Sequence, residues 1–226
     1  MTSTPILYSL HNCPYAIRAR IALIRANQQV RIRSIKLDNK PIEMLYASPK
    51  GSVPVLIVET PGSDKPMVIE ESLEIMVWAL SQSDPHGLLC VNDQNALPEI
   101  IHLIADFEHH FIPALNAYSC AKRYHEDNLV ECRQACEIQL KHLEERLGKH
   151  AFLFSEQESL LDIALMPFLR KFARIEKQWF RQSPYPKLRA WLNRYLQSYL
   201  FSKVMENHEL WRENQADLFF GPFTKK

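Results

Sequence analysis

Residues 6–25, ILYSLHNCPYAIRARIALIR, run from an apolar segment through a cysteine and a proline into a helical pattern. Ile6 to Leu10 is short and β-type, which predicts a strand. Tyr15 to Asn27 carries apolar residues at helical spacing, which predicts a helix. A strand that leads directly into a helix is typical of a mixed α/β unit, and Cys13 and Pro14 stand at the junction of the two elements.

The alternation of strand and helix patterns continues along the chain. Val30 to Leu37 alternates apolar and basic residues with period two, which predicts a strand with one apolar face. PVLIVE, from Pro54, predicts a buried strand, and PGSDKP predicts a hairpin turn before a strand over Met67 to Ile69. A helical pattern from Glu71 to Ser81 follows. We therefore expect an α/β domain over residues 1–82.

Strand patterns are absent beyond a linker at about residues 83–95. Apolar residues from Leu97 to Tyr118 form a helical stripe, and Pro113 should kink that helix because it removes one backbone donor. Three more helices are expected, over Glu126 to Leu147, Ser159 to Arg174 and Lys187 to Leu200. The sequence thus predicts that residues 96–226 form an all-helical domain.

Composition narrows the class of protein. The chain has 226 residues, of which 46% are hydrophobic and 23% are charged, as in a folded globular protein. A formal net charge of +1 gives no general case for binding nucleic acid or a membrane surface. Five cysteines do not form the even, closely spaced set of a secreted disulfide scaffold. With no leader pattern and no long apolar run, we expect a cytoplasmic protein with reduced thiols.

Cys13 is the first candidate for chemistry. If the helix begins at Pro14, the sulfur lies at the first turn, where backbone N–H groups are unpaired. The positive end of the helix dipole favours the thiolate, which is the nucleophilic form of cysteine. The alternative is a buried structural cysteine, which is the more common role of a single cysteine. Its place at the start of a helix favours the reactive interpretation.

Three motifs in order carry a resemblance to a known family: CPYA at residues 13–16, GSVPVLI at residues 51–57 and IEES at residues 69–72. With the α/β-then-helical layout, they resemble the cytosolic glutathione transferases, and within them the cysteine-type omega-like and thiol-transferase classes. The resemblance covers essentially the whole chain and is densest in residues 6–82. It implies a thioredoxin-like glutathione-binding domain, a helical domain that forms the second-substrate wall, and a homodimer.

The resemblance also implies how individual residues bind glutathione. Val53–Pro54 would be a cis peptide, and the Val53 backbone would pair with the cysteinyl part of the tripeptide. Glu71 would accept a hydrogen bond from the γ-glutamyl ammonium, and Ser72 would donate to the neighbouring carboxylate. Capping of the helix by Ser72 explains that serine equally well. Lys40 would bind the glycyl carboxylate, although an exposed lysine is often only a solvated charge.

Ala16 stands where a second cysteine would complete a dithiol motif. The sequence therefore predicts a monothiol cycle, in which Cys13 takes up a glutathionyl group and a second glutathione releases it. Glutathione is then a co-substrate, and no covalently bound cofactor is expected. Two alternatives stay open: weak conjugating activity based on Tyr8 or Ser9, and a non-enzymatic binding protein on the same fold, like the stringent-starvation-type proteins that bind RNA polymerase.

The helical half offers further candidates. Ser159 and Asp162 form a capping box, which concerns stability rather than chemistry. Phe107, Phe111 and Tyr118 are candidates to line a second-substrate pocket between the domains, or they belong to the core. The identity of the second substrate cannot be read from the sequence.

Two polar patterns are interpreted as surface. A histidine-rich helix face and a cysteine pair one turn apart lack the ligand set of a zinc site, so we expect no metal. These residues are His102, Asp106, His109, His110, Cys132 and Cys136. The basic run over residues 170–194, which includes Trp179 and Phe180, could meet an acidic partner or RNA, but charge runs are usually solvated faces.

Overall fold

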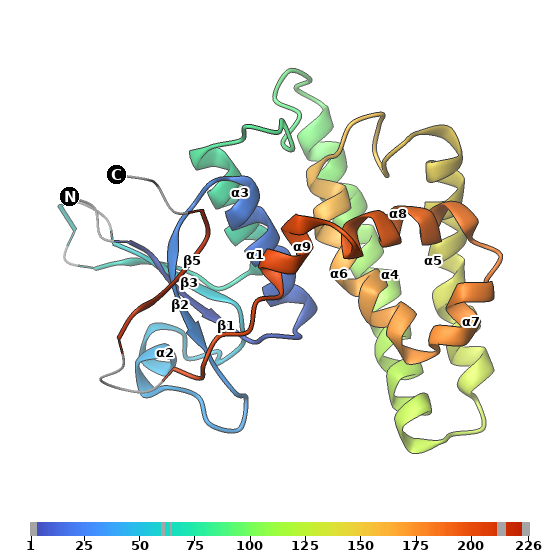
Figure 1. Cartoon of the computed structure of the whole chain (residues 1–226), viewed down its shortest axis with the longest axis horizontal. Coiled ribbons are helices and arrows are strands. Elements are labelled where there is room, and N and C mark those ends of the chain that lie inside the picture. The colour runs from blue at the N-terminus through green and yellow to red at the C-terminus, as the bar shows by residue number, and fades with distance from the viewer. Residues whose placement is uncertain (1–3, 60–61, 64, 212–215, 223–226) are drawn as a thin grey trace. The chain divides into compact units, whose positions relative to one another are not determined.

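The computed structural model describes residues 4–59, 62–63, 65–211 and 216–222. The chain forms two compact units. The first runs to Pro85 and takes up the chain again at Tyr199, and the second extends from His86 to Ser198 (Figure 1). Among the described residues, no helix has the length and apolar character needed to cross a membrane.

The first unit is built on a mixed five-stranded sheet with the order β4-β3-β1-β2-β5. The strands are β1 (Ile6–Ser9), β2 (Val30–Ser34), β3 (Val55–Val58), β4 (Met67–Ile69) and β5 (Leu218–Phe220). β1 and β2 are parallel, whereas β3, β4 and β5 each run antiparallel to their neighbours. This is the expected thioredoxin-like domain, and only β5 was not predicted.

Helices cover both faces of this sheet. The helices of the unit are α1 (Pro14–Arg25), α2 (Ile42–Ala47), α3 (Ser72–Gln82) and α9 (Tyr199–Val204). α1 packs against α3 and α9, and Figure 1 shows α1 and α3 side by side. On the other face, Met44 of α2 closes a small apolar core with Tyr8, Ile35 and Val55. Side-chain alternation along β1 thus serves two cores, with Tyr8 on one face and Leu7 on the other.

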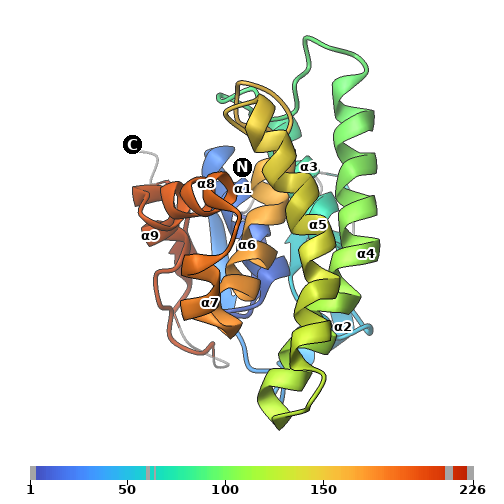
Figure 2. The same cartoon turned by 90° about the vertical axis from the view of Figure 1, so that its right-hand side faces the viewer.

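The second unit is all helical, as expected. Its helices are α4 (Ala96–Tyr124), α5 (Leu129–Lys149), α6 (Leu160–Ile175), α7 (Lys177–Gln182) and α8 (Pro186–Leu196). α4 and α5 form a long antiparallel pair, and α6 packs against α4 and α8 (Figure 2). Pro113 lies on the exposed side of α4, which is assigned as one continuous helix through it. The short helix α7 was not predicted.

The expected boundary of the helical domain, residues 96–226, is wrong for its last part. From Tyr199 onward the described chain packs on the first unit, where the Arg20 guanidinium donates to the Val204 carbonyl and the Trp211 N–H donates to the Ser34 carbonyl. β5 then pairs with β2 and covers what would otherwise be an open sheet edge. Three residues are too few to show a period, and β5, unlike the equally short β4, has no predicted hairpin turn before it to indicate a strand.

The helix expected over Lys187 to Leu200 is also corrected. α8 ends at Leu196 and α9 begins at Tyr199, so two short helices replace one. Between them the Ser198 hydroxyl donates to the Tyr195 carbonyl at 2.6 Å, which satisfies one of the last carbonyls of α8. This break lies where the chain passes from the second unit to the first.

The capping box at the start of α6 is confirmed. The Asp162 carboxylate is fully buried and accepts hydrogen bonds from the Ser159 N–H at 3.0 Å and the Ser159 hydroxyl at 2.9 Å. It also accepts from the Leu153 N–H and from the Trp191 indole N–H. Burial raises the pKa of Asp162, and the four donors act in the opposite direction. One carboxylate thus ties α6 to α8 and to the preceding loop.

Asp162→Asn should destabilise the protein by about 1–3 kcal/mol, because an amide NH₂ would face N–H donors that now bind a carboxylate oxygen. Urea unfolding followed by circular dichroism measures the loss. Glu156→Gln, at a nearby exposed carboxylate, is the control and should change stability by less than about 0.5 kcal/mol. Equal midpoints for the two variants would show that the Asp162 bonds contribute nothing.

Gly221→Ala should weaken the attachment of β5. The backbone φ of Gly221 is +109°, and a Cβ there would lie 2.4 Å from the Gln28 carbonyl oxygen. Amide exchange in β2 and β5 should therefore quicken by at least about tenfold. Gly62→Ala, at φ +79° with no atom within 4 Å, tests the backbone strain alone. Similar exchange in both variants would contradict the role assigned to this close approach.

Candidate functional site

Strand pairing brings four separate loops to one edge of the sheet, the edge formed by the carboxyl ends of β1 and β2. These two strands are parallel, so both end there. Cys13 lies in the loop after β1, and Lys40 lies in the loop after β2. β3 runs antiparallel to β1, so the Val53–Pro54 segment that precedes it starts at the same edge. β4 runs antiparallel to β3 and ends there, just before Glu71. The sequence-predicted residues of the first unit therefore gather at one place.

Cys13 occupies the N-cap position of α1, and Pro14 is the first helical residue. The Cys13 carbonyl accepts the first helical hydrogen bond, from the Ile17 N–H at 2.9 Å, and its own N–H donates to the Leu10 carbonyl. Its sulfur lies 3.9 Å from the Val53 carbonyl oxygen and is partly exposed. The thiol thus sits beside the amino-terminal end of a twelve-residue helix and faces the loop before β3.

The loop before β3 has the backbone shape that the motif implies. Val53–Pro54 is a cis peptide bond. Gly51 adopts φ +64°, in the left-handed region where glycine is favoured, and its N–H donates to the Ser48 carbonyl at 3.0 Å. A side chain at Gly51 would lie 3.3 Å from the Lys40 ammonium nitrogen. Glycine therefore lets the Lys40 side chain lie directly over this loop.

Glu71 and Ser72 mark the start of α3. Glu71 is the N-cap residue, and its exposed carboxylate pairs with the Lys50 ammonium from the loop before β3. Ser72 is the first helical residue, is 3% exposed and accepts a hydrogen bond from the Arg18 Nε at 3.0 Å. No side-chain capping bond is present at the start of this helix. The capping explanation for Ser72 is therefore not what the structure shows.

Tyr8 and Ser9, the residues considered for conjugating chemistry, are engaged elsewhere. The Tyr8 hydroxyl accepts from Arg33 at 2.6 Å, and the Ser9 hydroxyl accepts from Arg20. Burial raises the pKa of Tyr8 although Arg33 acts to lower it. Tyr8 is fully buried and its hydroxyl is bonded to Arg33, so the phenol is closed to a thiol that approaches from solvent.

Two family models match the chain: the glutathione S-transferase N-terminal domain over residues 7–86 and the glutathione S-transferase C-terminal domain over residues 130–194. Pyrimidodiazepine synthase of Drosophila melanogaster is 30% identical over 194 residues, which cover 83% of this chain and 75% of that protein. The chain belongs to the glutathione S-transferase family.

Further comparisons agree with this family. Mouse glutathione S-transferase omega-1 is 26% identical over 82% of this chain and 74% of its own length. A crystal structure of a glutathione transferase family member from Pseudomonas fluorescens, with two glutathione bound, superimposes with a TM-score of 0.76. It has 20% sequence identity and covers 89% of this chain and 92% of its own, so the likeness is one of fold.

The aromatic candidates of this glutathione S-transferase family member lie in the helical unit. Phe111 is fully buried and stacks on Phe107 at a centroid distance of 4.6 Å. Tyr118 is also fully buried, and its hydroxyl donates to Glu176 at 2.7 Å. These contacts favour the core interpretation for Phe111 and Tyr118. That Phe107, Phe111 and Tyr118 line a second-substrate pocket stays a prediction.

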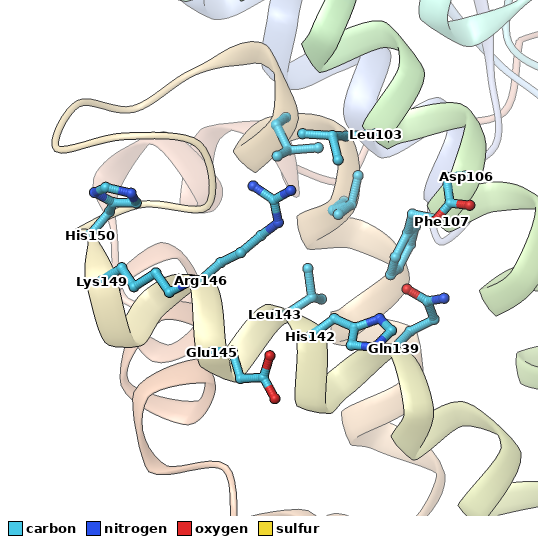
Figure 3. A pocket seen from close by; sticks show the side chains of 12 residues that line it. Leu103, Asp106, Phe107, Gln139, His142, Leu143, Glu145, Arg146, Lys149 and His150 are labelled. Carbon is cyan, nitrogen blue, oxygen red and sulfur yellow. The ribbon is translucent and has the colours of Figure 1, made fainter.

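Phe107 also lines a pocket of about 450 Å³ bordered by α4, α5 and α6. Figure 3 shows Phe107 on α4 near Gln139 and His142 on α5, with the Arg146 side chain farther along the pocket. The Arg146 guanidinium donates to the Leu153 carbonyl at 3.4 Å, so it is held within the helical unit.

The structure also shows the two polar patterns that were interpreted as surface, the histidine and cysteine residues and the basic run. Among the residues that the structure describes, no group of His, Cys, Asp or Glu side chains could hold a metal ion. In the basic run over residues 170–194, Phe180 is buried and Trp179 lies under the Arg133 guanidinium at 4.5 Å. Lys187 and Arg194 donate to backbone carbonyls. These rings are therefore packing residues, which speaks against a surface built to stack on RNA.

Two residues at the site were missed by the sequence analysis. Lys50 follows the proline of an ordinary loop, and Arg18 lies inside the first helix. Their partners, Glu71 and Ser72, are 21 and 54 residues away in sequence. No local spacing links such residues, so only the folded chain reveals these pairs.

Proposed function

We propose that this family member is a glutathione-dependent thiol transferase that acts on mixed disulfides or small oxidised electrophiles through Cys13 alone. The observation that supports this most directly is the position of the thiol. Its sulfur lies at the amino-terminal end of α1, 3.9 Å from the Val53 carbonyl, at the edge that also holds Lys40, Glu71 and Ser72.

The proposed binding mode follows the order of these loops. The glycyl carboxylate of glutathione would pair with Lys40, and the cysteinyl part would pair with the Val53 backbone. The γ-glutamyl group would reach α3, where Glu71 accepts from its ammonium and Ser72 donates to its carboxylate. The solved Pseudomonas fluorescens family member carries glutathione, which supports glutathione as the co-substrate here.

The proposed cycle has two exchanges. The Cys13 thiolate attacks the glutathionyl sulfur of a mixed disulfide, so a Cys13–glutathione disulfide forms and the substrate leaves as its thiolate. A second glutathione thiolate then attacks the glutathionyl sulfur of that adduct. Oxidised glutathione forms and the Cys13 thiolate is regenerated. One free glutathione is consumed in each turnover: it joins the glutathionyl group taken from the substrate as oxidised glutathione, the substrate leaves as its thiolate, and the enzyme is unchanged.

The surroundings of Cys13 support a monothiol cycle. Ala16 is fully buried and offers no thiol. The other four cysteines, Cys90, Cys120, Cys132 and Cys136, are not in disulfide bonds and belong to the other unit. Dehydroascorbate carries no glutathionyl group, so its reduction through Cys13 would take two electrons from two glutathione molecules, which leave as oxidised glutathione. The homodimer and the cytoplasmic location stay predictions.

Cys13→Ser should lower the glutathione-dependent reduction of a small mixed disulfide by at least about 100-fold, because the hydroxyl cannot form the covalent intermediate. Glutathione binding, measured by calorimetry, should persist because its proposed contacts remain. Cys120→Ser changes an exposed cysteine outside the site and is the control. Mass spectrometry of the wild-type protein should find the glutathionyl adduct on Cys13.

Other results would point to the two alternatives. A wild-type protein that binds glutathione but reduces no disulfide would be a binding protein on this fold. Conjugation of glutathione to an electrophile that survives in Cys13→Ser would identify a conjugating transferase.

Lys50→Met should tighten glutathione binding by up to about fivefold at low ionic strength. The Lys50 ammonium now pairs with Glu71, which raises the pKa of Lys50, and the ligand ammonium must replace it. The gain should shrink in 0.5 M salt. Lys65→Met, at an exposed lysine, is the control. Weaker binding by Lys50→Met would mean that Lys50 contacts the ligand itself.

A further inference from the structure

Arg18 is a buried cation on the second turn of α1. Its side chain is 2% exposed, and its Nε donates to the Ser72 hydroxyl at 3.0 Å. The guanidinium also lies over the Tyr15 ring at 5.3 Å. Burial of a guanidinium is costly unless its donors find acceptors, so this contact constrains both helices. Arg18 thus joins the helix that carries Cys13 to the helix that begins with Ser72.

The contact with Arg18 fixes the role of the Ser72 hydroxyl. A serine hydroxyl has one proton to donate and two lone pairs to accept. A guanidinium only donates, so the Ser72 oxygen must act as the acceptor toward Arg18. The Ser72 proton then points to another acceptor. At the first residue of an eleven-residue helix, the neighbouring N–H groups favour an anion as that acceptor.

We propose that Arg18 is a positioning residue that makes Ser72 a donor for the γ-glutamyl carboxylate of the thiol co-substrate. Arg18 thereby sets the preference for γ-glutamyl thiols over thiols that lack this group. The inference rests on the proposed function, since it assigns a role within the same glutathione site. Arg18 acts through the Ser72 hydroxyl, whose oxygen it occupies as an acceptor so that the hydroxyl proton is left for the ligand.

Arg20 provides a matched control on the same helix. It too is 2% exposed, but it donates to the Val204 carbonyl, the Ser9 hydroxyl and the His11 carbonyl. It is tied to the carboxyl-terminal segment instead of α3. A substitution of Arg20 therefore tests the general cost of losing a buried guanidinium from α1.

The experiment compares glutathione with cysteinylglycine, which lacks the γ-glutamyl group, as the reducing thiol. Arg18→Gln should raise KM for glutathione by about tenfold and change kcat by less than about threefold. KM for cysteinylglycine should not change. Arg18→Lys should show part of this loss only, because the ammonium can still donate to the Ser72 hydroxyl but lacks the planar guanidinium. Arg20→Gln should lower the thermal midpoint and leave the ratio of the two KM values as in the wild type.

A double-mutant comparison completes the test. Arg18→Gln in a Ser72→Ala background should cause little further loss of glutathione affinity, because Arg18 acts through that hydroxyl. Equal rises of KM for both thiols, or additive losses in the double variant, would overturn the proposal. Calorimetric Kd values for glutathione separate this outcome from failure of the proposed function. A wild type that binds glutathione without turnover still reports on Arg18, and a wild type that binds none overturns both proposals.

Discussion

The antiparallel pairing of β3 with β1 is the constraint on which the site depends. Tyr8 lies opposite Val55, so the end of β1 and the start of β3 must share one edge of the sheet. A shift of one residue would turn every side chain of β3 to the opposite face and move the loop before it. The same register carries through to β4, since Leu56 lies opposite Ile69. The register of the sheet therefore brings the site residues together although they are far apart in sequence, and no direct attraction between them is needed.

Two buried arginines then hold α1 in place over this edge. Arg18 connects the helix to α3 through Ser72, and Arg20 connects it to the chain beyond Tyr199 through Val204. Hydrogen bonds to a charged donor are stronger than neutral ones, and each buried guanidinium would be costly without them. The orientation of α1 is thus fixed on both sides by hydrogen bonds from buried guanidinium groups.

The helical unit is organised by a different principle. Its core is an aromatic cluster in which Phe172 lies close to Phe111, Tyr118 and Phe180. At one side of the cluster, burial opposes the charge of Glu176, but hydrogen bonds from Tyr118, Arg133 and Lys122 outweigh it and lower the pKa of Glu176. The polar side chains around Glu176 are thus used for bonds within the helical unit, next to its packed rings.

The sequence by itself determined the order of strands β1 to β4 and of helices α1 and α3 to α6, the helix start at Pro14 and the capping box at Ser159. Each of these depends on neighbours within a few residues, where backbone geometry and hydrophobic period act directly. Only the tertiary structure decided that Lys50 pairs with Glu71, that Arg18 holds Ser72, and that the segment after Tyr199 returns to add β5 to the sheet. These contacts join residues that are tens to hundreds of positions apart, so no local pattern in the sequence indicates them. They arise because strand register and burial leave buried donors and an open sheet edge that must find partners.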